Sequence, residues 1–250
     1  MLVNELKLFF FHVPRTGGTS VNRWFLENGF LRRDKLVDNG QDLPILYGKL
    51  PVGDITIELD ALTQDHFQYL CSDFVKETFK KVVILRDPAE RAFSVYKRMK
   101  LTGDRRILSL QATDSFRNWC EEVYALKRSG LFDRPFDVHK FPHDKVSHLL
   151  PQSAYVLDGS GQINVDHVLM QSDLSASWLE LIKKFGVNPA WVTYPLSEDG
   201  GRMAVSSLSE VSVGDEGFDY ERDLLFDIYE RDFELLVDNR IVDRIVKGKP

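Results

Sequence analysis

Apolar residues form two kinds of pattern along this chain, and each kind predicts a different element. Short continuous apolar runs at Leu6–Val13 and Lys81–Leu85 are typical of buried strands. Apolar residues spaced three and four positions apart predict amphipathic helices. Such helices are expected at Thr19–Leu26, at Ser72–Phe79, from Pro88 through Met99, from Ser115 to about Lys127, at Leu174–Phe185 and at Asp219–Val237. Shorter strands are expected at Tyr155–Leu157 and His167–Met170.

Strands and helices that alternate in this way imply right-handed strand–helix–strand units around a mainly parallel sheet. We therefore predict an α/β fold whose sheet is flanked by helices on both faces. The chain has 250 residues, of which 43% are hydrophobic and 28% charged, a composition typical of globular proteins. We predict a single domain over residues 1–250. Residues 31–60 are rich in turn signals and predict no clear element.

Net charge, cysteine content and apolar run length limit which partners the protein can bind and where in the cell it is expected. The formal net charge of −6 argues against a surface built throughout for nucleic acid. Cys71 and Cys120 lie far apart and lack metal-ligand spacing, so both are expected to be reduced thiols. No stretch approaches the ~20 apolar residues of a membrane span, and Leu8–Phe11 is too short for a secretory signal. We expect a cytoplasmic protein, with a truncated chain as the alternative.

The first strand leads into a loop suited to hold phosphate, where a glycine turn and hydroxyl residues open a helix. Glycines let backbone N–H groups approach an anion closely, and the helix start adds the positive end of its dipole. The nucleoside-triphosphatase loop has a Lys after its last glycine, whereas here the cation, Arg15, precedes the glycines. A plain structural turn is the alternative. The loop residues are Pro14, Arg15, Thr16, Gly17, Gly18, Thr19 and Ser20.

A second motif begins where the apolar strand Val82–Leu85 ends. Arg86 follows the strand directly, and Pro88 suits the first turn of the next helix. Ser94 falls off the apolar stripe of that helix. Ser94 is therefore free to bind a ligand. An ion-paired helix start is the alternative for this motif taken by itself.

In this order, the two motifs resemble the sulfotransferases that use 3′-phosphoadenosine 5′-phosphosulfate (PAPS), within them the carbohydrate type that includes the heparan sulfate 2-O and 6-O enzymes. Weaker likeness continues at Pro151–Val156, Val165–Leu169 and Ile228–Leu235. The resemblance implies a P-loop-type domain, a bacterial member of the family and PAPS as the sulfuryl donor. It assigns the donor's 3′-phosphate to Arg86 and Ser94. It assigns the 5′-phosphosulfate to Arg15, Thr16, Gly17, Gly18, Thr19 and Ser20.

Sulfuryl transfer needs in-line positioning, relief of charge on the leaving oxygen and removal of a proton from the acceptor. Arg15 stands where the family has a Lys near the bridging oxygen, so its guanidinium is expected to stabilise the departing phosphate. His66 is the candidate general base, because imidazole titrates near neutral pH and the family's catalytic His also lies upstream of this strand. A structural His is the alternative. The other candidates are His12, His139, His143, His148 and His167. No metal is implied.

Three further features have structural interpretations, and two of them also have functional ones. Arg91 is expected to pair with Asp87 or Glu90 in a structural role. The loop Glu198–Arg202 is a surface turn or a cover over the nucleotide. The basic residues after the second motif form a solvated face or attract an anionic acceptor or the donor's phosphates. They are Lys97, Arg98, Lys100, Arg105 and Arg106.

The resemblance implies an acceptor hydroxyl on a glycan or glycolipid. One departure weakens any inference about acceptor contacts, because Met170–Leu174 replaces the Arg-Phe-Glu-x-Leu run that is common in the family. Two other functions stay open, a non-catalytic nucleotide- or glycan-binding module and a relative of P-loop kinases. The missing Gly-Lys-[Ser/Thr] argues against the kinase, and Arg15 together with His66 argues against the binding module. The acceptor's identity and the oligomeric state are left open.

Overall fold

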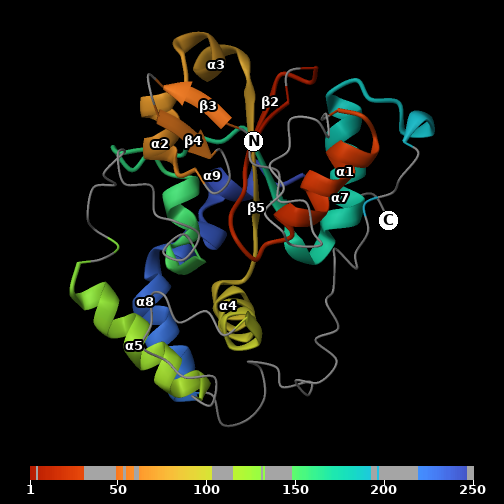
Figure 1. The fold of residues 1–250 in the computed structure, drawn as a ribbon. Helices are drawn as coiled ribbons and strands as arrows, with labels where there is room; N and C mark the ends of the chain where they lie inside the picture. Colours follow the sequence, from red (N-terminus) through yellow and green to blue (C-terminus); the bar gives the residue numbers. More distant parts are fainter. Residues whose placement is uncertain are drawn as a thin grey trace.

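A small, mostly parallel sheet lies at the centre of the molecule (Figure 1). The computed structural model describes residues 1–3, 5–30, 49–52, 55–58, 62–102, 115–130, 132, 148–192, 196 and 219–246. Within these residues the sheet has four strands in the order β1, β2, β5, β6. The last three run parallel, and β1 is antiparallel to β2. The bounds are β1 Leu2–Val3, β2 Leu8–Phe11, β5 Lys80–Leu85 and β6 His167–Met170.

Each parallel strand is followed by a helix. These helices are α1 (Gly18–Glu27) after β2, α4 (Pro88–Thr102) after β5 and α7 (Leu174–Lys184) after β6. The other helices are α2 (Gln64–Leu70), α3 (Asp73–Thr78), α5 (Phe116–Arg128), α8 (Asp219–Val237) and α9 (Asn239–Val242). Short 3-10 helices are η2 (Gln152–Tyr155), η3 (Gln171–Asp173) and η4 (Pro189–Trp191), and β3 (Lys49–Val52) pairs with β4 (Ile55–Glu58) in a hairpin.

Side chains of β2 alternate between two apolar clusters, as the period of a strand requires. Leu8 and Phe10 belong to the cluster that contains residues of α1 and α7. Phe9 and Phe11 belong to the cluster that contains Phe67 of α2, whose ring centroid lies 4.5 Å from that of Phe9. All four β2 side chains are buried, so the strand that leads into the glycine loop is anchored along its whole length.

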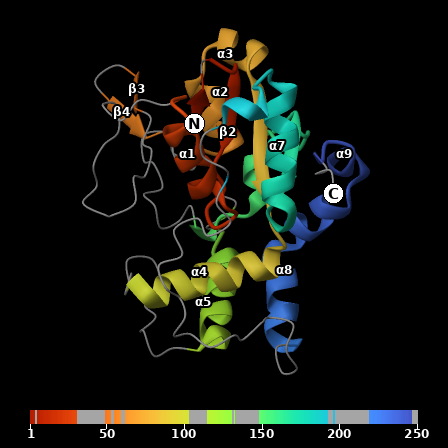
Figure 2. The same ribbon diagram turned by 90° about the vertical axis from the view of Figure 1, so that its right-hand side faces the viewer.

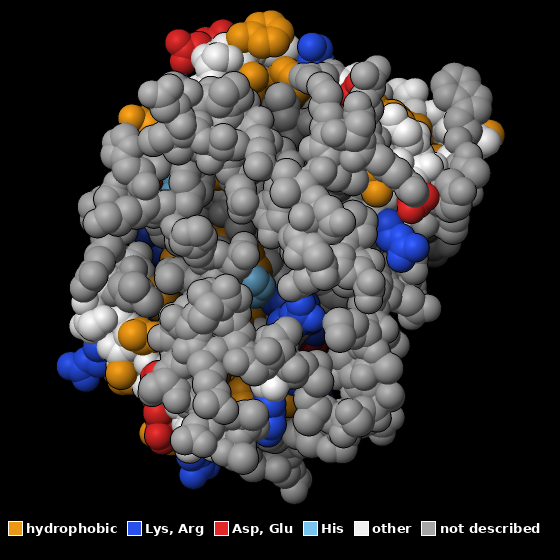
Figure 3. Space-filling model, in the orientation of Figure 1, with side chains coloured by type: hydrophobic (Ala, Val, Ile, Leu, Met, Phe, Trp, Pro, Cys, Tyr) orange, Lys and Arg blue, Asp and Glu red, His pale blue; other side chains and the backbone are white. Residues whose placement is uncertain are grey.

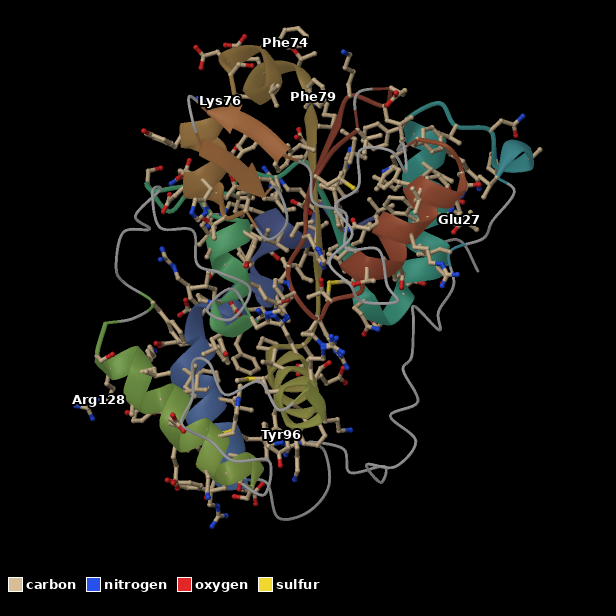
Figure 4. All side chains as sticks on the ribbon, viewed as in Figure 1. Glu27, Phe74, Lys76, Phe79, Tyr96 and Arg128 are labelled. Carbon is tan, nitrogen blue, oxygen red and sulfur yellow. The ribbon has the colours of Figure 1, made fainter. Side chains whose placement is uncertain are left out.

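A third apolar cluster joins α4, α5 and α8 at the carboxyl end of β5 (Figure 2). Tyr96 of α4 contacts this cluster, with its ring centroid 5.2 Å from that of Phe116. Figure 4 labels Tyr96 at this end of the molecule and Phe74 and Phe79 at the opposite end, beside α3. The helical cluster thus lies next to the strand ends where both predicted motifs begin.

The predicted α/β fold with a mainly parallel sheet is confirmed. His167–Met170 and Asp219–Val237 have the predicted bounds, and the helices after β2, β5 and β6 lie within three residues of their predicted ends. Both cysteines are buried and free, as expected. Across the described residues, no helix combines the length and the apolar character that a membrane crossing requires.

Several predicted elements need correction. The strand expected from Leu6 begins at Leu8, because Lys7 has a φ of 48° and breaks the extended backbone. The strand expected at Tyr155–Leu157 is wrong, since the carbonyl of Ser153 accepts hydrogen bonds from the N–H groups of Val156 and Leu157 and closes a turn. Hydrophobic spacing also gave no signal for the helix α2.

Candidate active site

The loop between β2 and α1 has the backbone shape that the glycine motif predicts. Gly17 has a φ of 100° and caps α1, which starts at Gly18. Arg15 has a φ of 71°, a left-handed conformation that is uncommon for a residue other than glycine. The hydroxyl of Thr16 donates to the carbonyl of Val13 at 2.9 Å and is buried. The Thr16 side chain therefore fixes the loop from inside, which leaves its backbone N–H as its means of binding an anion.

Both glycines are needed because side chains occupy the space beside them. A Cβ on Gly18 would lie 2.1 Å from Cδ2 of His12, and a Cβ on Gly17 would lie 2.8 Å from Cδ2 of Leu174. The imidazole of His12 and the first turn of α7 thus pack against the glycine loop. The first backbone N–H groups of α1, from Gly18 and Thr19, have no acceptor within the helix, and together with the helix dipole they make a cradle for an anion.

The second motif joins β5 to α4. Arg86 follows Leu85, the last residue of β5, and Nε of Arg86 lies 3.2 Å from Oε2 of Glu90. The carboxylate of Asp87 accepts a hydrogen bond from the N–H of Glu90 at 2.9 Å, which caps the first turn of α4. These bonds orient Arg86 and the start of α4 together.

The two motifs meet in space. Nε of Arg15 donates a hydrogen bond of 3.1 Å to Oγ of Ser94, across 79 residues of sequence. The contact follows from the sheet, because β2 and β5 are neighbouring parallel strands whose carboxyl ends lie at the same edge. Arg15 comes from the loop after β2, and Ser94 comes from the helix after β5. The residues predicted for two separate anion sites therefore form one site.

This site is strongly cationic. Burial first, and then the charges of Arg98 and Arg86, lower the pKa of the Arg15 guanidinium to about 10, although part of the side chain is exposed. Burial also lowers the pKa of Lys97, again with a contribution from Arg86. The positive charges of these neighbouring side chains repel one another, and an anion bound among them would relieve that repulsion.

The surface agrees with this electrostatic picture. On the face drawn in Figure 3, Lys and Arg side chains lie beside a His near the centre of the molecule. In the same orientation, Figure 1 shows the end of β5 and the start of α4 at this place. Arg15 is itself exposed, so the cationic site reaches the surface.

His66 occupies the third position of α2 and is buried. Its Nδ1 lies 2.9 Å from Oγ1 of Thr63 and 3.3 Å from the N–H of the same residue, which caps the helix. Burial lowers the pKa of His66 to about 4, so the imidazole is neutral at pH 7. The next residue, Phe67, packs on Phe9 and Phe11, and this contact sets α2 beside β2.

The other histidines have different surroundings. His12 packs against the glycine loop, His148 offers its carbonyl to Arg91, and His167 opens β6, where burial lowers its pKa. His139 and His143 lie outside the described residues, as do Arg105, Arg106 and the loop Glu198–Arg202.

The prediction for Arg91 was right about its role and wrong about its partners. Arg91 is buried, and its Nε donates to the carbonyl of Pro14 at 3.0 Å while its Nη2 donates to the carbonyl of His148 at 3.2 Å. It therefore ties α4 to the glycine loop. The acidic neighbour Glu90 contacts Arg86 instead.

Comparison with known proteins identifies the group to which this arrangement belongs. The model of the sulfotransferase family matches residues 1–237, which is nearly the whole chain. The chain belongs to the sulfotransferase family. This membership supports sulfuryl transfer as the class of reaction. It also covers both anion-binding motifs and the later segments that carried the weaker resemblance.

One curated relative matches part of the chain. A protein-tyrosine sulfotransferase of Arabidopsis thaliana is 32% identical over 90 residues, which cover 36% of this chain and 17% of the relative. The chain thus aligns with only about a sixth of the length of that relative. No solved structure matches the chain.

Sequence reasoning left the place of Lys97 and Arg98 undecided between a solvated face and an anion site. The charge of Arg98 acts on Arg15 and the charge of Arg86 acts on Lys97, so both residues lie close to the cationic site. Helical spacing contains the signal, because positions 97 and 98 follow Ser94 by three and four residues and share its side of α4. The segment Gln171–Leu174 also borders the site, through the contact of Leu174 with Gly17.

Proposed function

We propose that this protein transfers a sulfuryl group from PAPS to a hydroxyl of an acceptor. The observation that carries the proposal is the hydrogen bond from Arg15 to Ser94, which joins a glycine loop and an arginine motif into one cationic site. PAPS carries its phosphosulfate and its 3′-phosphate on a single nucleotide, so its two anionic ends need two neighbouring binding elements. Membership in the sulfotransferase family supports the same donor.

The glycine loop would hold the 5′ end of the donor. Backbone N–H groups at Thr16 through Thr19 and the hydroxyls of Thr19 and Ser20 supply hydrogen-bond donors at the start of α1. Arg15 would lie at the bond that breaks, where its guanidinium stabilises the negative charge that grows on the leaving phosphate oxygen. The closeness of Arg86 and Arg98 favours this role, because their repulsion is relieved when negative charge develops beside Arg15.

The arginine motif would hold the 3′-phosphate. Arg86 offers a planar fork of donors that suits a phosphate, and Ser94 adds a hydroxyl. In this structure Arg86 is paired with Glu90, whose side chain is 58% exposed. Ion pairs with an exposed partner contribute about 0–1 kcal/mol, so a phosphate dianion competes well for the guanidinium.

His66 is proposed as the general base. With a pKa of about 4, the imidazole is neutral at pH 7 and has a lone pair for a proton, but it is a weaker base than the near-neutral imidazole expected from the sequence. The backbone N–H of Thr63 donates to Nδ1 at 3.3 Å, so in this structure Nδ1 is the acceptor and Nε2 carries the proton of the neutral ring. For Nε2 to accept the proton of the acceptor hydroxyl, the proton must first move to Nδ1, which can then donate it to Oγ1 of Thr63, 2.9 Å away.

The chemical step then balances without a further reactant. The acceptor oxygen forms a bond to sulfur as the bond between sulfur and the bridging phosphate oxygen breaks, and His66 takes the hydroxyl proton. The products are the sulfate ester and 3′-phosphoadenosine 5′-phosphate. Arg15 acts on the leaving side and His66 on the attacking side, so the two groups are expected on opposite sides of the sulfur. No metal ion is required by this scheme.

The acceptor is proposed to be a hydroxyl on a glycan or glycolipid, which rests on the motif resemblance to carbohydrate sulfotransferases. A tyrosine hydroxyl in a protein is the second candidate, because the plant relative is a protein-tyrosine sulfotransferase. Both acceptors are hydroxyls that must lose a proton, so the same donor site and the same base serve either one.

We further propose that residues 1–250 form one domain with helices on both faces of the sheet. The match to the sulfotransferase family over residues 1–237 supports one domain. The alternation of β2 side chains between a cluster with α1 and α7 and a cluster with α2 supports helices on both faces, as does the placing of these helices on either side of β2 in Figure 1.

Transfer of radiolabelled sulfate from PAPS tests the function directly. The protein is incubated with labelled donor, with glycans, a glycolipid and tyrosine peptides as separate acceptors, and with or without a metal chelator. We expect label on one acceptor class, unchanged by the chelator. Donor binding without transfer to any acceptor would favour a binding module, and phosphate transfer from ATP that stops with the chelator would favour a kinase relative.

A further inference from the structure

The side chain of Gln152 holds the backbone of Arg86 at both of its polar groups. Oε1 of Gln152 accepts a hydrogen bond from the N–H of Arg86 at 3.0 Å, and Nε2 donates to the carbonyl of Arg86 at 2.8 Å. The ladder between β5 and β6 ends one residue earlier, at the pair Leu85 and Met170. The amide of Gln152 therefore takes the place of a neighbouring strand and fixes the backbone where the arginine side chain begins.

Gln152 is itself held by Asp232 of α8. The carboxylate of Asp232 accepts the N–H of Gln152 at 2.7 Å and the N–H of Ser153 at 2.8 Å. Both Gln152 and Asp232 are 1% exposed. Burial raises the pKa of Asp232, while the charge of Arg91 and the two N–H donors lower it. Arg91 in turn donates to the carbonyl of Pro14, which precedes Arg15.

One buried pair thus holds the backbone where the arginine motif begins. Gln152 and Asp232 come from η2 and α8, segments that the arginine motif does not contain. A buried amide with both ends bonded is costly to displace, because each broken bond leaves a polar group without a partner away from water. The backbone is therefore rigid at the place where the Arg86 side chain starts.

We propose that Gln152 is a positioning residue that aims Arg86 at the 3′-phosphate of the donor and so sets the preference for that phosphate. The proposal rests on the function proposed above. An arginine side chain has several rotatable bonds, so its fork meets a phosphate in the right geometry only if its backbone is fixed. Loosening this backbone would weaken contacts to the 3′-phosphate and spare contacts made by the glycine loop.

The test compares two glutamine variants by calorimetry. Gln152→Met removes the amide at nearly constant size. Gln64→Met is the matched control, because Gln64 is also fully buried and its amide donates to the carbonyls of Tyr155 and Asn164 at 2.9 and 3.0 Å. The quantity measured is the Kd for 5′-AMP divided by the Kd for 3′-phosphoadenosine 5′-phosphate. Thermal unfolding of each variant is recorded beside it.

We expect Gln152→Met to lower this ratio about tenfold, with the affinity for 5′-AMP little changed. Gln64→Met should lower the unfolding temperature and leave the ratio at the wild-type value. An unchanged ratio in Gln152→Met would overturn the proposal, and so would an equal fall of the ratio in Gln64→Met. If Gln152→Met does not fold, Gln152→Asn decides in the same way, since its shorter amide cannot reach both backbone groups of Arg86.

Arg86→Ala separates this proposal from the proposed function. If Arg86→Ala loses the preference and Gln152→Met keeps it, Gln152 is not a positioning residue and the donor site stands. If the wild-type protein has no preference, or Arg86→Ala retains it, the assignment of Arg86 to the 3′-phosphate is wrong, and the positioning role is wrong with it.

Discussion

At the scale of single residues, Arg15 is under two kinds of strain. Its backbone is left-handed with a φ of 71°, and its charge is crowded by Arg86 and Arg98. Strained backbone of this kind persists only where the surrounding structure enforces it, and it is common at functional sites. The buried bonds from Thr16 to Val13 and from Arg91 to Pro14 enforce it here. In the proposed function, this constrained backbone directs the Arg15 guanidinium towards the leaving group.

Replacing Arg15 should therefore affect turnover more than donor binding. We predict that Arg15→Ala lowers kcat about 10²–10³-fold, the usual effect of losing one donor to a developing oxyanion. Arg15→Lys should keep substantial activity, since it retains the charge. Steady-state kinetics together with calorimetric donor binding measures both effects. Normal turnover of Arg15→Ala would show that another group stabilises the leaving phosphate.

His66 should matter for chemistry and hardly for donor binding. We predict that His66→Ala lowers kcat roughly 10²–10⁴-fold, or about 3–5 kcal/mol of barrier, with the Kd of 3′-phosphoadenosine 5′-phosphate nearly unchanged. Circular dichroism checks that the variant folds. His167→Ala, at a half-buried His on β6, is the control and should turn over normally. A folded His66→Ala with near-normal kcat would point to His139, His143 or an acidic residue.

The low pKa of His66 also predicts a dependence of stability on pH. Folding lowers this pKa from 6.5 to about 4, so between these values the unfolded chain binds a proton that the folded chain does not. The free energy of unfolding must then fall as the pH falls from about 6.5 towards 4, by up to about 3 kcal/mol from this group. Urea unfolding of the wild type and His66→Gln at pH 7 and pH 4.5 measures the difference. Parallel losses in the two proteins would refute the shift.

At the scale of elements, the start of α1 depends on a fit between Gly18 and His12. Alanine is a better helix former than glycine, yet a Cβ at this position would lie 2.1 Å from the imidazole. We predict that Gly18→Ala lowers the free energy of unfolding by about 1–3 kcal/mol and weakens donor binding. Denaturant unfolding and calorimetry measure these effects.

Gly159→Ala is the matched control, because the atom nearest to its added Cβ is Oδ1 of Asp65 at 3.7 Å. Its unfolding free energy should change by no more than about 0.5 kcal/mol. The double variant His12→Ala with Gly18→Ala removes the clash, so it should be more stable than the sum of the two single changes implies. Simple additivity would mean that the imidazole does not set the shape of the loop.

Most elements were predictable because burial dictates their patterns. The strands β2, β5 and β6 are buried runs, and α8 carries an apolar stripe, so each was found from spacing alone. The helix α2 was missed because it is short and mixes Gln, His and Tyr with Phe. The turn at η2 was taken for a strand because Tyr155 and Val156 are buried apolar residues in either conformation.

At the scale of the whole molecule, the sequence allowed us to predict that the two motifs lie together. It did not allow us to predict the hydrogen bonds that hold the backbone of Arg86. Neighbouring parallel strands bring the ends of β2 and β5 together, which follows from the order of the elements. The hydrogen bond between Arg86 and Gln152 joins positions 66 residues apart, and the hydrogen bond between Gln152 and Asp232 joins positions 80 residues apart. A glutamine or aspartate in the sequence carries no sign of its distant partner, so this network is visible only in three dimensions.

The central claim is that the two motifs form one site for a nucleotide that carries phosphates at both the 5′ and the 3′ positions. Calorimetric titration of the wild-type protein and Arg86→Ala with 3′-phosphoadenosine 5′-phosphate, 5′-AMP and 3′-AMP tests it most directly. The site predicts that the bisphosphate binds the wild type tens-fold more tightly than either monophosphate, since charge-assisted bonds contribute about 1.5–3 kcal/mol each. It also predicts that Arg86→Ala loses most of the advantage over 5′-AMP. Equal affinity of the wild type for the bisphosphate and 5′-AMP would contradict the claim.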